Sequence, residues 1–155
     1  MTGIDHCDWE GVSCNSDGYV TQLSLQDNNL IGPIPQSIGN VVNLKWLYLA
    51  HNELTGPIPD TIGNLVNLEW LDLYENELTG PIPDAFKHLN LLRGLILLKN
   101  ELTGPIPESI KYLRNLDVLF LFFGNELGPT PDWLKSFCER RRKGGGTCMC
   151  DSTLF

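Results

Sequence analysis

The sequence predicts a short, curved α/β repeat solenoid, with a parallel β-sheet on its concave face and 3₁₀ or irregular segments on its convex face. The first observation is a repeat of 24 residues, which places leucines in two columns along the chain. The second is that the two leucines of each unit stand two positions apart, as in a strand with one buried face. The third is that one unit cannot enclose its own leucines, whereas stacked units can. The columns are Leu23, Leu47, Leu71, Leu95 and Leu119, and Leu25, Leu49, Leu73, Leu97 and Leu121.

Each unit leaves its predicted strand at an asparagine. In the second unit, Asn52 follows the strand that contains Leu47 and Leu49. Its side chain can hydrogen-bond backbone groups of its own turn and of the neighbouring unit, which would otherwise be buried without partners. We therefore expect a structural ladder along the stack, formed by Asn28, Asn52, Asn76 and Asn100.

The rest of the unit returns to the next strand without a regular helix. Gly56 permits a backbone conformation that other residues avoid, and Pro57 and Pro59 prevent a helix from forming. Apolar residues then follow at a spacing of three, starting with Ile62 and Leu65, which suits a short 3₁₀ segment on the convex side.

The unit L-x-x-L-x-L-x-x-N-x-L-x-G-x-I-P resembles the plant-type leucine-rich repeat, and the resemblance covers about residues 20–137. It implies the solenoid fold of receptor-kinase ectodomains and polygalacturonase-inhibiting proteins, an extracellular or cell-surface location, and binding of a protein or peptide on the concave face. The same scaffold serves receptors, enzyme inhibitors and adaptors, so the motif is far more specific for fold than for function.

We divide the chain into a partial cysteine cap (1–19), five repeats of which the last is degenerate (20–137), and a C-terminal tail (138–155). The cap segment C-x-W-x-G-V-x-C resembles the second half of the N-terminal cap of this family, which implies that Cys7 pairs with Cys14 and that Trp9 covers the first leucine layer. The helix that normally precedes this motif is missing. Of a natural short protein and a truncated gene product or fragment, we favour the second.

The tail begins with a cysteine and a basic run and continues with three glycines. Family caps often end in a cysteine pair, so Cys138 is expected to pair with Cys148 or Cys150, and the sequence leaves this choice open. A zinc site formed by the three lacks a nearby histidine, and we predict no metal. We interpret the basic run at 140–143 as a solvated linker in preference to a nuclear or polyanion-binding signal.

Composition limits the classes of function. A net charge of −8 and a pI of about 4.7 argue against nucleic acid or an anionic membrane as a partner. The sequence has neither a membrane-spanning stretch nor a signal peptide. Neither an H-E-x-x-H nor a G-x-S-x-G motif occurs, so we predict no enzyme and no cofactor. One column of carboxylates is expected to be a solvated edge: Glu53, Glu77, Glu101 and Glu126.

The residues that the leucines leave free point onto the concave face, and they become less polar along the stack. The candidate binding residues are Trp46, Tyr48, Trp70, Asp72 and Tyr74, flanked by Ile96 and Phe120. Soluble monomers seldom leave such an apolar patch uncovered. Either the C-terminal segment folds over Ile96, Leu98, Phe120 and Phe122, or the patch has lost its neighbours, or it recognises a protein or peptide. The alternative function is structural or adhesive, such as glycan or ice binding.

Overall fold

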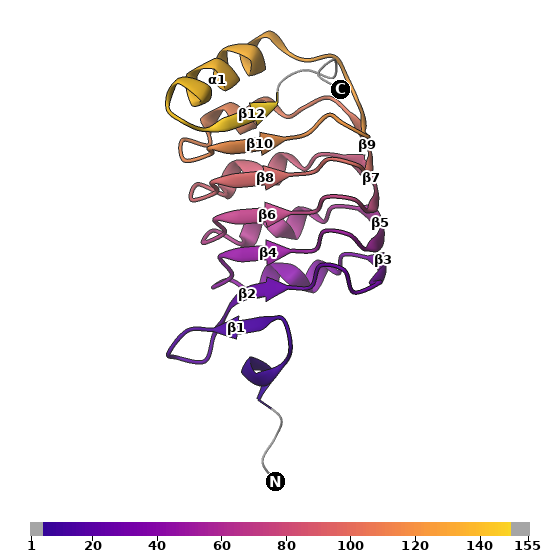
Figure 1. The fold of residues 1–155 in the computed structure, drawn as a ribbon, viewed down its shortest axis with the longest axis vertical. Helices are drawn as coiled ribbons and strands as arrows, with labels where there is room; N and C mark the ends of the chain where they lie inside the picture. The colour runs from indigo at the N-terminus through magenta and orange to yellow at the C-terminus, as the bar shows by residue number, and fades with distance from the viewer. Residues whose placement is uncertain (1–4, 150–155) are drawn as a thin grey trace.

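The computed structural model describes residues 5–149, which form a short solenoid of stacked units (Figure 1). One sheet runs the length of the stack in the order β1-β2-β4-β6-β8-β10-β12, and all its neighbours are parallel except β1 and β2. We call its outward surface the concave face. The strands are β1 (Val12–Cys14), β2 (Val20–Ser24), β4 (Trp46–Tyr48), β6 (Trp70–Asp72), β8 (Gly94–Ile96), β10 (Val118–Phe120) and β12 (Thr147–Met149).

The register of this sheet follows the repeat. Leu47 is aligned with Leu23 on one side and with Leu71 on the other, so that leucines of successive units stack inside the solenoid. Leu47, Leu71 and Leu95 are completely buried. The predicted solenoid with its parallel sheet is therefore confirmed, and the core is a column of leucine layers that neighbouring units enclose together.

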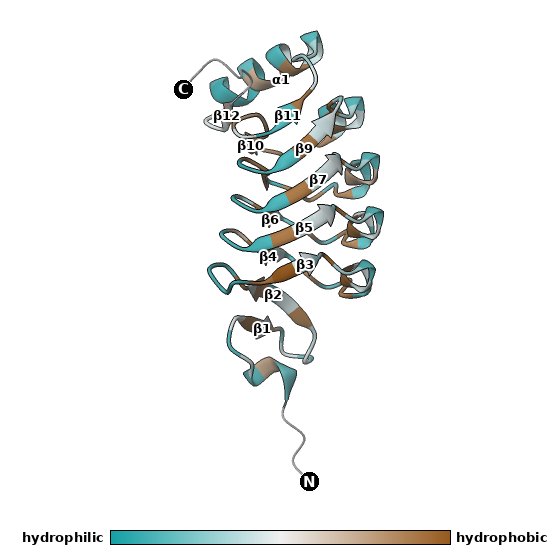
Figure 2. Ribbon diagram, turned by 90° about the vertical axis from the view of Figure 1, so that its right-hand side faces the viewer, coloured by the Kyte–Doolittle hydropathy of each residue, from teal (hydrophilic) through white to brown (hydrophobic). Residues whose placement is uncertain are grey.

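A second parallel sheet forms where the sequence predicted irregular backbone. It contains β3 (Ile31–Pro33), β5 (Glu53–Pro57), β7 (Glu77–Pro81), β9 (Glu101–Gly104) and β11 (Glu126–Leu127), and it faces the viewer in Figure 2. In β5 the buried Leu54 lies between the more exposed Glu53 and Thr55, which is the alternation of a strand with one buried face. Pro57 is the last residue of β5 and is aligned with Thr79 of β7, so the proline does not prevent pairing.

Short 3₁₀ helices form the third side of the stack, as the sequence predicted. They are η2 (Gln36–Asn40), η3 (Asp60–Asn64), η4 (Asp84–His88) and η5 (Glu108–Tyr112). Ile62, Phe86 and Ile110 point from them into the core and are completely buried. Successive helices approach closely. A Cβ built on Gly63 would lie only 2.7 Å from the carbonyl oxygen of Ala85. Glycine at this position thus permits the stacking distance.

Buried asparagines connect the units where the chain leaves the first sheet. Asn52, Asn76 and Asn100 are at most 9% exposed, and their side-chain amides donate to carbonyls of their own and the preceding unit. Asn28 departs from the expected ladder: it is exposed, and its amide donates only to Gln26 in the same turn. The reason is its place in the first unit, which has no preceding repeat to supply carbonyls. Asn125 makes the equivalent contacts in the last unit.

The last repeat accommodates one extra residue. The Lys99 N–H donates to the Phe123 carbonyl, just as the Glu75 N–H donates to the Leu98 carbonyl. Phe123 therefore takes the register position of Leu98, and Phe122 is the extra residue. Phe122 was expected on the concave face, but it is 7% exposed and belongs to the core, because the insertion turns it inward.

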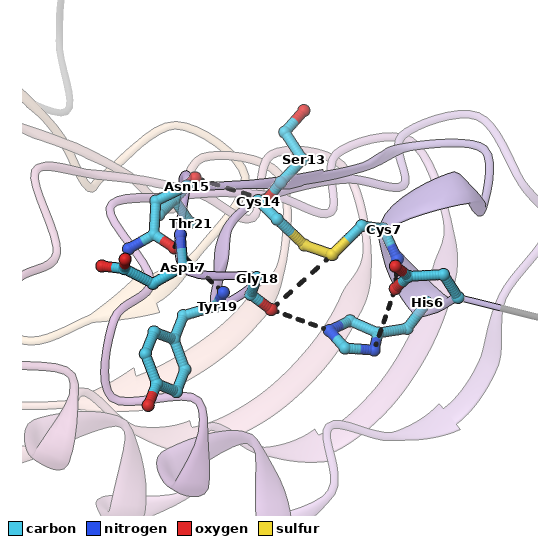
Figure 3. Close-up of a disulfide and its surroundings, with 10 residues drawn as sticks. His6, Cys7, Ser13, Cys14, Asn15, Asp17, Gly18, Tyr19 and Thr21 are labelled. Carbon is cyan, nitrogen blue, oxygen red and sulfur yellow. Dashed lines mark hydrogen bonds and ion pairs between the residues drawn. A yellow bond between two sulfur atoms is a disulfide. The ribbon is translucent and has the colours of Figure 1, made fainter.

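The N-terminal cap contains the 3₁₀ helix η1 (His6–Asp8) and strand β1. Cys7 and Cys14 are joined in a disulfide, with their Cα atoms 5.7 Å apart, and His6 Nε2 lies 3.2 Å from the Gly18 carbonyl oxygen (Figure 3). Trp9 is 57% exposed, so it does not cover the first leucine layer as expected. The cap instead adds β1 to the edge of β2.

The C-terminal end of the stack is closed by α1 (Asp132–Lys143) and by β12, which pairs with β10 (Figure 1). Cys138 in α1 is bonded to Cys148 in β12, while Cys150 lies outside the described residues. The boundary expected between 137 and 138 falls inside α1. The basic run at 140–143 forms the end of this helix and is not a linker, because Leu134, Phe137 and Cys138 bury one helix face on the core.

Candidate functional site

All seven candidate binding residues lie on the concave face, as neighbours. Trp46 is aligned with Trp70, and Tyr48 is aligned with Asp72, on the adjacent strands β4 and β6. Tyr74 lies two residues beyond the end of β6. On β8 and β10, Ile96 and Phe120 continue the row of Tyr48 and Asp72. All seven side chains are partly exposed, while the leucines between them are buried. We call Trp46, Tyr48, Trp70, Asp72 and Tyr74 the aromatic strip.

Trp70 occupies a space that the next repeat leaves empty. Its partner across the strands is Gly94, and a Cβ built on Gly94 would lie 2.5 Å from the indole ring. The indole therefore lies against the backbone of β8 and covers Gly94, which is buried. Because this contact restricts the ring, Trp70 presents a pre-positioned aromatic ring on the concave face.

Tyr74 is held from two sides. The ring of His51 meets it edge-on, with centroids 5.0 Å apart, and Lys99 Nζ lies 5.2 Å from its centroid. Glu75 lies between the same two neighbours, 3.4 Å from His51 Nδ1 and in an ion pair with Lys99 Nζ at 3.1 Å. The hydrogen bond from Lys99, followed by one from Tyr74, lowers the pKa of Glu75. The hydrogen bond between Lys99 and Tyr74, followed by the one between Lys99 and Glu75, raises the pKa of Lys99, so the Glu75–Lys99 pair stays ionised over a wide pH range.

Asp72 supplies a partly desolvated carboxylate in the middle of the strip. Burial raises its pKa above the usual range, although the Tyr74 N–H donates to Asp72 Oδ1 at 3.0 Å and His51 also stabilises the charge. Burial, and then the nearby Asp72 charge, raise the pKa of Tyr48. Tyr48 therefore keeps its hydroxyl proton, and the two side chains present an adjacent donor and acceptor.

A row of charges of alternating sign lies along the edge where the strands of the concave sheet begin. It consists of Lys45, Glu69, Arg93 and Asp117, with Lys45 Nζ 3.9 Å from Glu69 and Arg93 Nη2 3.5 Å from Asp117. Three of these charges line a groove of about 280 Å³ together with both strip tryptophans and Val118.

The sequence pattern did not mark the charges of this row as site residues. Their spacing of 24 residues was the available signal, and it was hidden because the residue type changes at each step. The sequence pattern also did not mark one column at the opposite edge of the sheet, which is formed at the same spacing by His51, Glu75 and Lys99.

The described residues offer one grouping with metal-ligand chemistry, formed by His6, Cys7 and Cys14. Both cysteines are joined in the disulfide, so their sulfurs are not available as thiolate ligands. In the described part of the chain, no helix is long and apolar enough to cross a membrane.

Comparison with known proteins agrees with this architecture. Residues 19–78 match the family described as leucine rich repeat. The MDIS1-interacting receptor like kinase 1 of Arabidopsis thaliana is 50% identical over 40 residues, which are 26% of this chain and 4% of that protein. The curated relatives are therefore far longer, and this chain spans only about 5% of their length.

Solved structures match over most of the chain. A chain of the BIR3–SERK2 complex from Arabidopsis thaliana has a TM-score of 0.81 and 36% identity, covering 94% of this chain and 76% of that one. The PEPR1–AtPEP1 structure matches with a TM-score of 0.80 and 36% identity over 86% of this chain and 19% of the other. A plant ice-binding protein matches with a TM-score of 0.67 and 30% identity, covering 82% of this chain and 49% of the other. On this likeness in sequence, repeat and architecture, the chain belongs to the plant-type leucine-rich-repeat family.

Proposed function

We propose that this chain is a non-catalytic recognition module that binds a protein or peptide across the aromatic strip. The observation that carries the proposal is the alignment of Trp46 with Trp70 and of Tyr48 with Asp72 on adjacent strands of the concave face. Adjacent strands lie about 4.8 Å apart, so these side chains form one continuous surface. Tryptophan and tyrosine dominate the binding energy of many protein interfaces.

The strip is also pre-organised. Trp70 lies against the backbone at Gly94, and Tyr74 lies between His51 and Lys99. Side chains that are already ordered lose less conformational entropy when a partner binds, so more of the contact energy remains as affinity. Asp72 in the middle can accept hydrogen bonds from a donor on the partner, which would set the direction in which a peptide lies.

The expected setting is extracellular, as a receptor-like ectodomain or a secreted recognition or inhibitor protein. Two disulfides support it, since disulfides persist in oxidising compartments. The likeness to a chain of the BIR3–SERK2 complex and to the PEPR1–AtPEP1 structure supports a protein or peptide as the ligand class.

The test is a selection of peptides from a random library on the immobilised protein, followed by titration of the selected peptides against variants. We expect Trp70→Ala to weaken binding about 30-fold or more, as loss of a hot-spot aromatic of about 2 kcal/mol does. Lys87→Ala, on the exposed part of η4, should leave binding unchanged. Selected peptides that bind Trp70→Ala with wild-type affinity would refute the site. A Trp70→Ala protein that is unfolded would show that the ring is core packing.

An adhesive function has one specific observation in its favour. On the second sheet, the pair of glutamate and threonine recurs in β5, β7 and β9, as Glu53 with Thr55, Glu77 with Thr79, and Glu101 with Thr103. A repeated outward row of one residue type suits a regular surface such as ice or a glycan crystal, and the likeness to a plant ice-binding protein agrees with it. Inhibition of ice recrystallisation that is lost in Thr79→Lys would support this alternative.

A further inference from the structure

The basic run at the end of α1 contributes to a hollow that the aromatic strip does not include. The hollow has a volume of about 360 Å³ and is lined by Lys111, Arg114, Phe137, Arg140 and Arg141. It lies where α1 packs against η5 and the residues that follow η5, so segments far apart in sequence bring their charges together. Among these described lining residues, four are cationic and none is acidic.

Part of this charge has a structural explanation. Cations in the last turn of a helix interact favourably with the helix dipole. Arg142 donates to the Cys148 carbonyl at 3.1 and 2.8 Å, and Arg141 Nη2 donates to the Leu113 carbonyl at 3.0 Å. The Arg141 guanidinium also lies 5.1 Å from the centre of the Phe137 ring. These contacts fix Arg141 in place, so its charge is held at the hollow without further loss of side-chain freedom.

Packing does not explain Arg114 and Arg140. Both are exposed, and their guanidinium groups form no hydrogen bond or ion pair with other residues in the described range 5–149. Lys111 is paired with Glu108, outside the lining of the hollow. Like charges so close together repel one another, and the chain as a whole carries a net charge of −8. A counter-charge from outside the chain would relieve this repulsion.

We propose that this hollow is a binding site for an acidic polysaccharide, with uronate carboxylates paired to Arg114, Arg140 and Arg141. A guanidinium presents parallel N–H donors that match the two oxygens of a carboxylate, and such charge-assisted pairs are the strongest of the common hydrogen bonds. A polyuronate repeats its carboxylates along the chain, so two or three arginines can be engaged at once, and the combined attachment exceeds that of one pair.

Two observations favour this ligand over a nucleic acid. Both disulfides of the described chain are of the kind found in oxidising, extracellular settings, where polysaccharides are available as polyanions. The net charge of −8 repels any polyanion at long range, so the ligand has to be held by contacts within the hollow itself. A short carbohydrate segment can bind in this way, whereas non-specific nucleic-acid binding depends on many phosphate contacts over a longer surface. The site lies outside the concave face and does not depend on the function proposed above.

The experiment is titration calorimetry of the wild-type protein with a size-fractionated oligogalacturonate at low and physiological salt. The test variant is Arg114→Gln/Arg140→Gln. The control is Lys87→Gln/Lys135→Gln, which removes two positive charges from exposed positions outside the lining of the hollow. Since the test variant removes two charge-assisted pairs, we expect it to weaken binding about tenfold or more, whereas the control changes it less than about twofold. Matching thermal unfolding curves would show that both variants are folded.

Four results would overturn the proposal. Equal weakening by the two double variants would mean that only the general charge matters, and absence of binding by the wild-type protein at physiological salt would mean that no site exists. Equally tight binding of a fully methyl-esterified oligomer would show that the arginines do not recognise the uronate carboxylates. A single-stranded oligonucleotide that binds as tightly, with the same dependence on Arg114 and Arg140, would replace the polysaccharide as the ligand class.

Discussion

The asparagine ladder yields a quantitative prediction about how the repeats hold together. In Asn76→Ala, four hydrogen bonds are removed. The Leu54 N–H loses Asn76 Oδ1 at 3.1 Å, and the amide no longer donates to the carbonyls of Leu49, Leu73 and Tyr74. The magnitude depends on which of these backbone groups is left without any partner.

Neighbouring asparagines share carbonyls. The Leu49 oxygen also accepts from Asn52 at 2.9 Å, and the Leu73 oxygen also accepts from Asn100 at 2.9 Å. Both therefore keep a donor when Asn76 is lost, and the buried Leu54 N–H is the group that becomes unsatisfied. One such group costs about 1–3 kcal/mol. We expect Asn76→Ala to lower the free energy of unfolding by about 2 kcal/mol, corresponding to a fall of about 4–8 °C in Tm for a chain of this size.

The sharing also predicts non-additivity. Only when Asn76 and Asn100 are both replaced by alanine does the Leu73 carbonyl lose both side-chain donors, so the double variant should be less stable than the sum of the single effects by about 1 kcal/mol. Urea titration of the two single variants, the double variant and Asn28→Ala measures this. Asn28 is the in-column control because its amide makes one exposed bond. Equal destabilisation by Asn28→Ala and Asn76→Ala, or strict additivity, would refute the reasoning.

Three further variants address the strip and the cap. Gly94→Ala places a Cβ about 2.5 Å from the Trp70 indole and must displace the ring, so binding of the selected peptides should be lost as in Trp70→Ala; unchanged peptide affinity would contradict this. Burial raises the pKa of Asp72, so wild-type stability falls as pH rises through that pKa; Asp72→Asn should be more stable than wild type in urea at neutral pH, with no gain well below pH about 4. Replacing Cys7 and Cys14 by serine should lower the unfolding free energy by about 2 kcal/mol, and an unchanged urea midpoint would count against it.

The period predicted the first sheet because leucine spacing fixes both strand face and register. It did not predict the second sheet, since Gly56 and Pro57 are read locally as turn residues, although they end a strand whose partners lie one repeat away. Local propensity also failed in the tail. The basic run at 140–143 is helical because residues before it are buried on the last repeat, and that tertiary contact has no periodic signal.

The candidate site could be predicted in position but not in detail. Strand alternation was enough to place Trp46 and Trp70 on one face. Residue spacing does not specify side-chain directions. It therefore could not predict that the Trp70 ring packs against Gly94, or that Tyr74 contacts His51 and Lys99. The cationic hollow could not be predicted, because it joins Arg114 to Arg140 through the packing of α1 on η5.

Charge distribution separates the two proposed sites by their response to salt. Both edges of the concave face carry opposite charges in ion pairs, such as Lys45 with Glu69 and Lys99 with Glu75. These pairs largely compensate one another, so binding at the aromatic strip should depend mainly on apolar contact and change little between low and physiological salt. The hollow at the end of α1 concentrates like charges, so binding there should weaken steeply over the same range. Titrating a selected peptide and the oligogalacturonate across that range tests this contrast. Equal salt dependence of the two ligands would contradict this contrast.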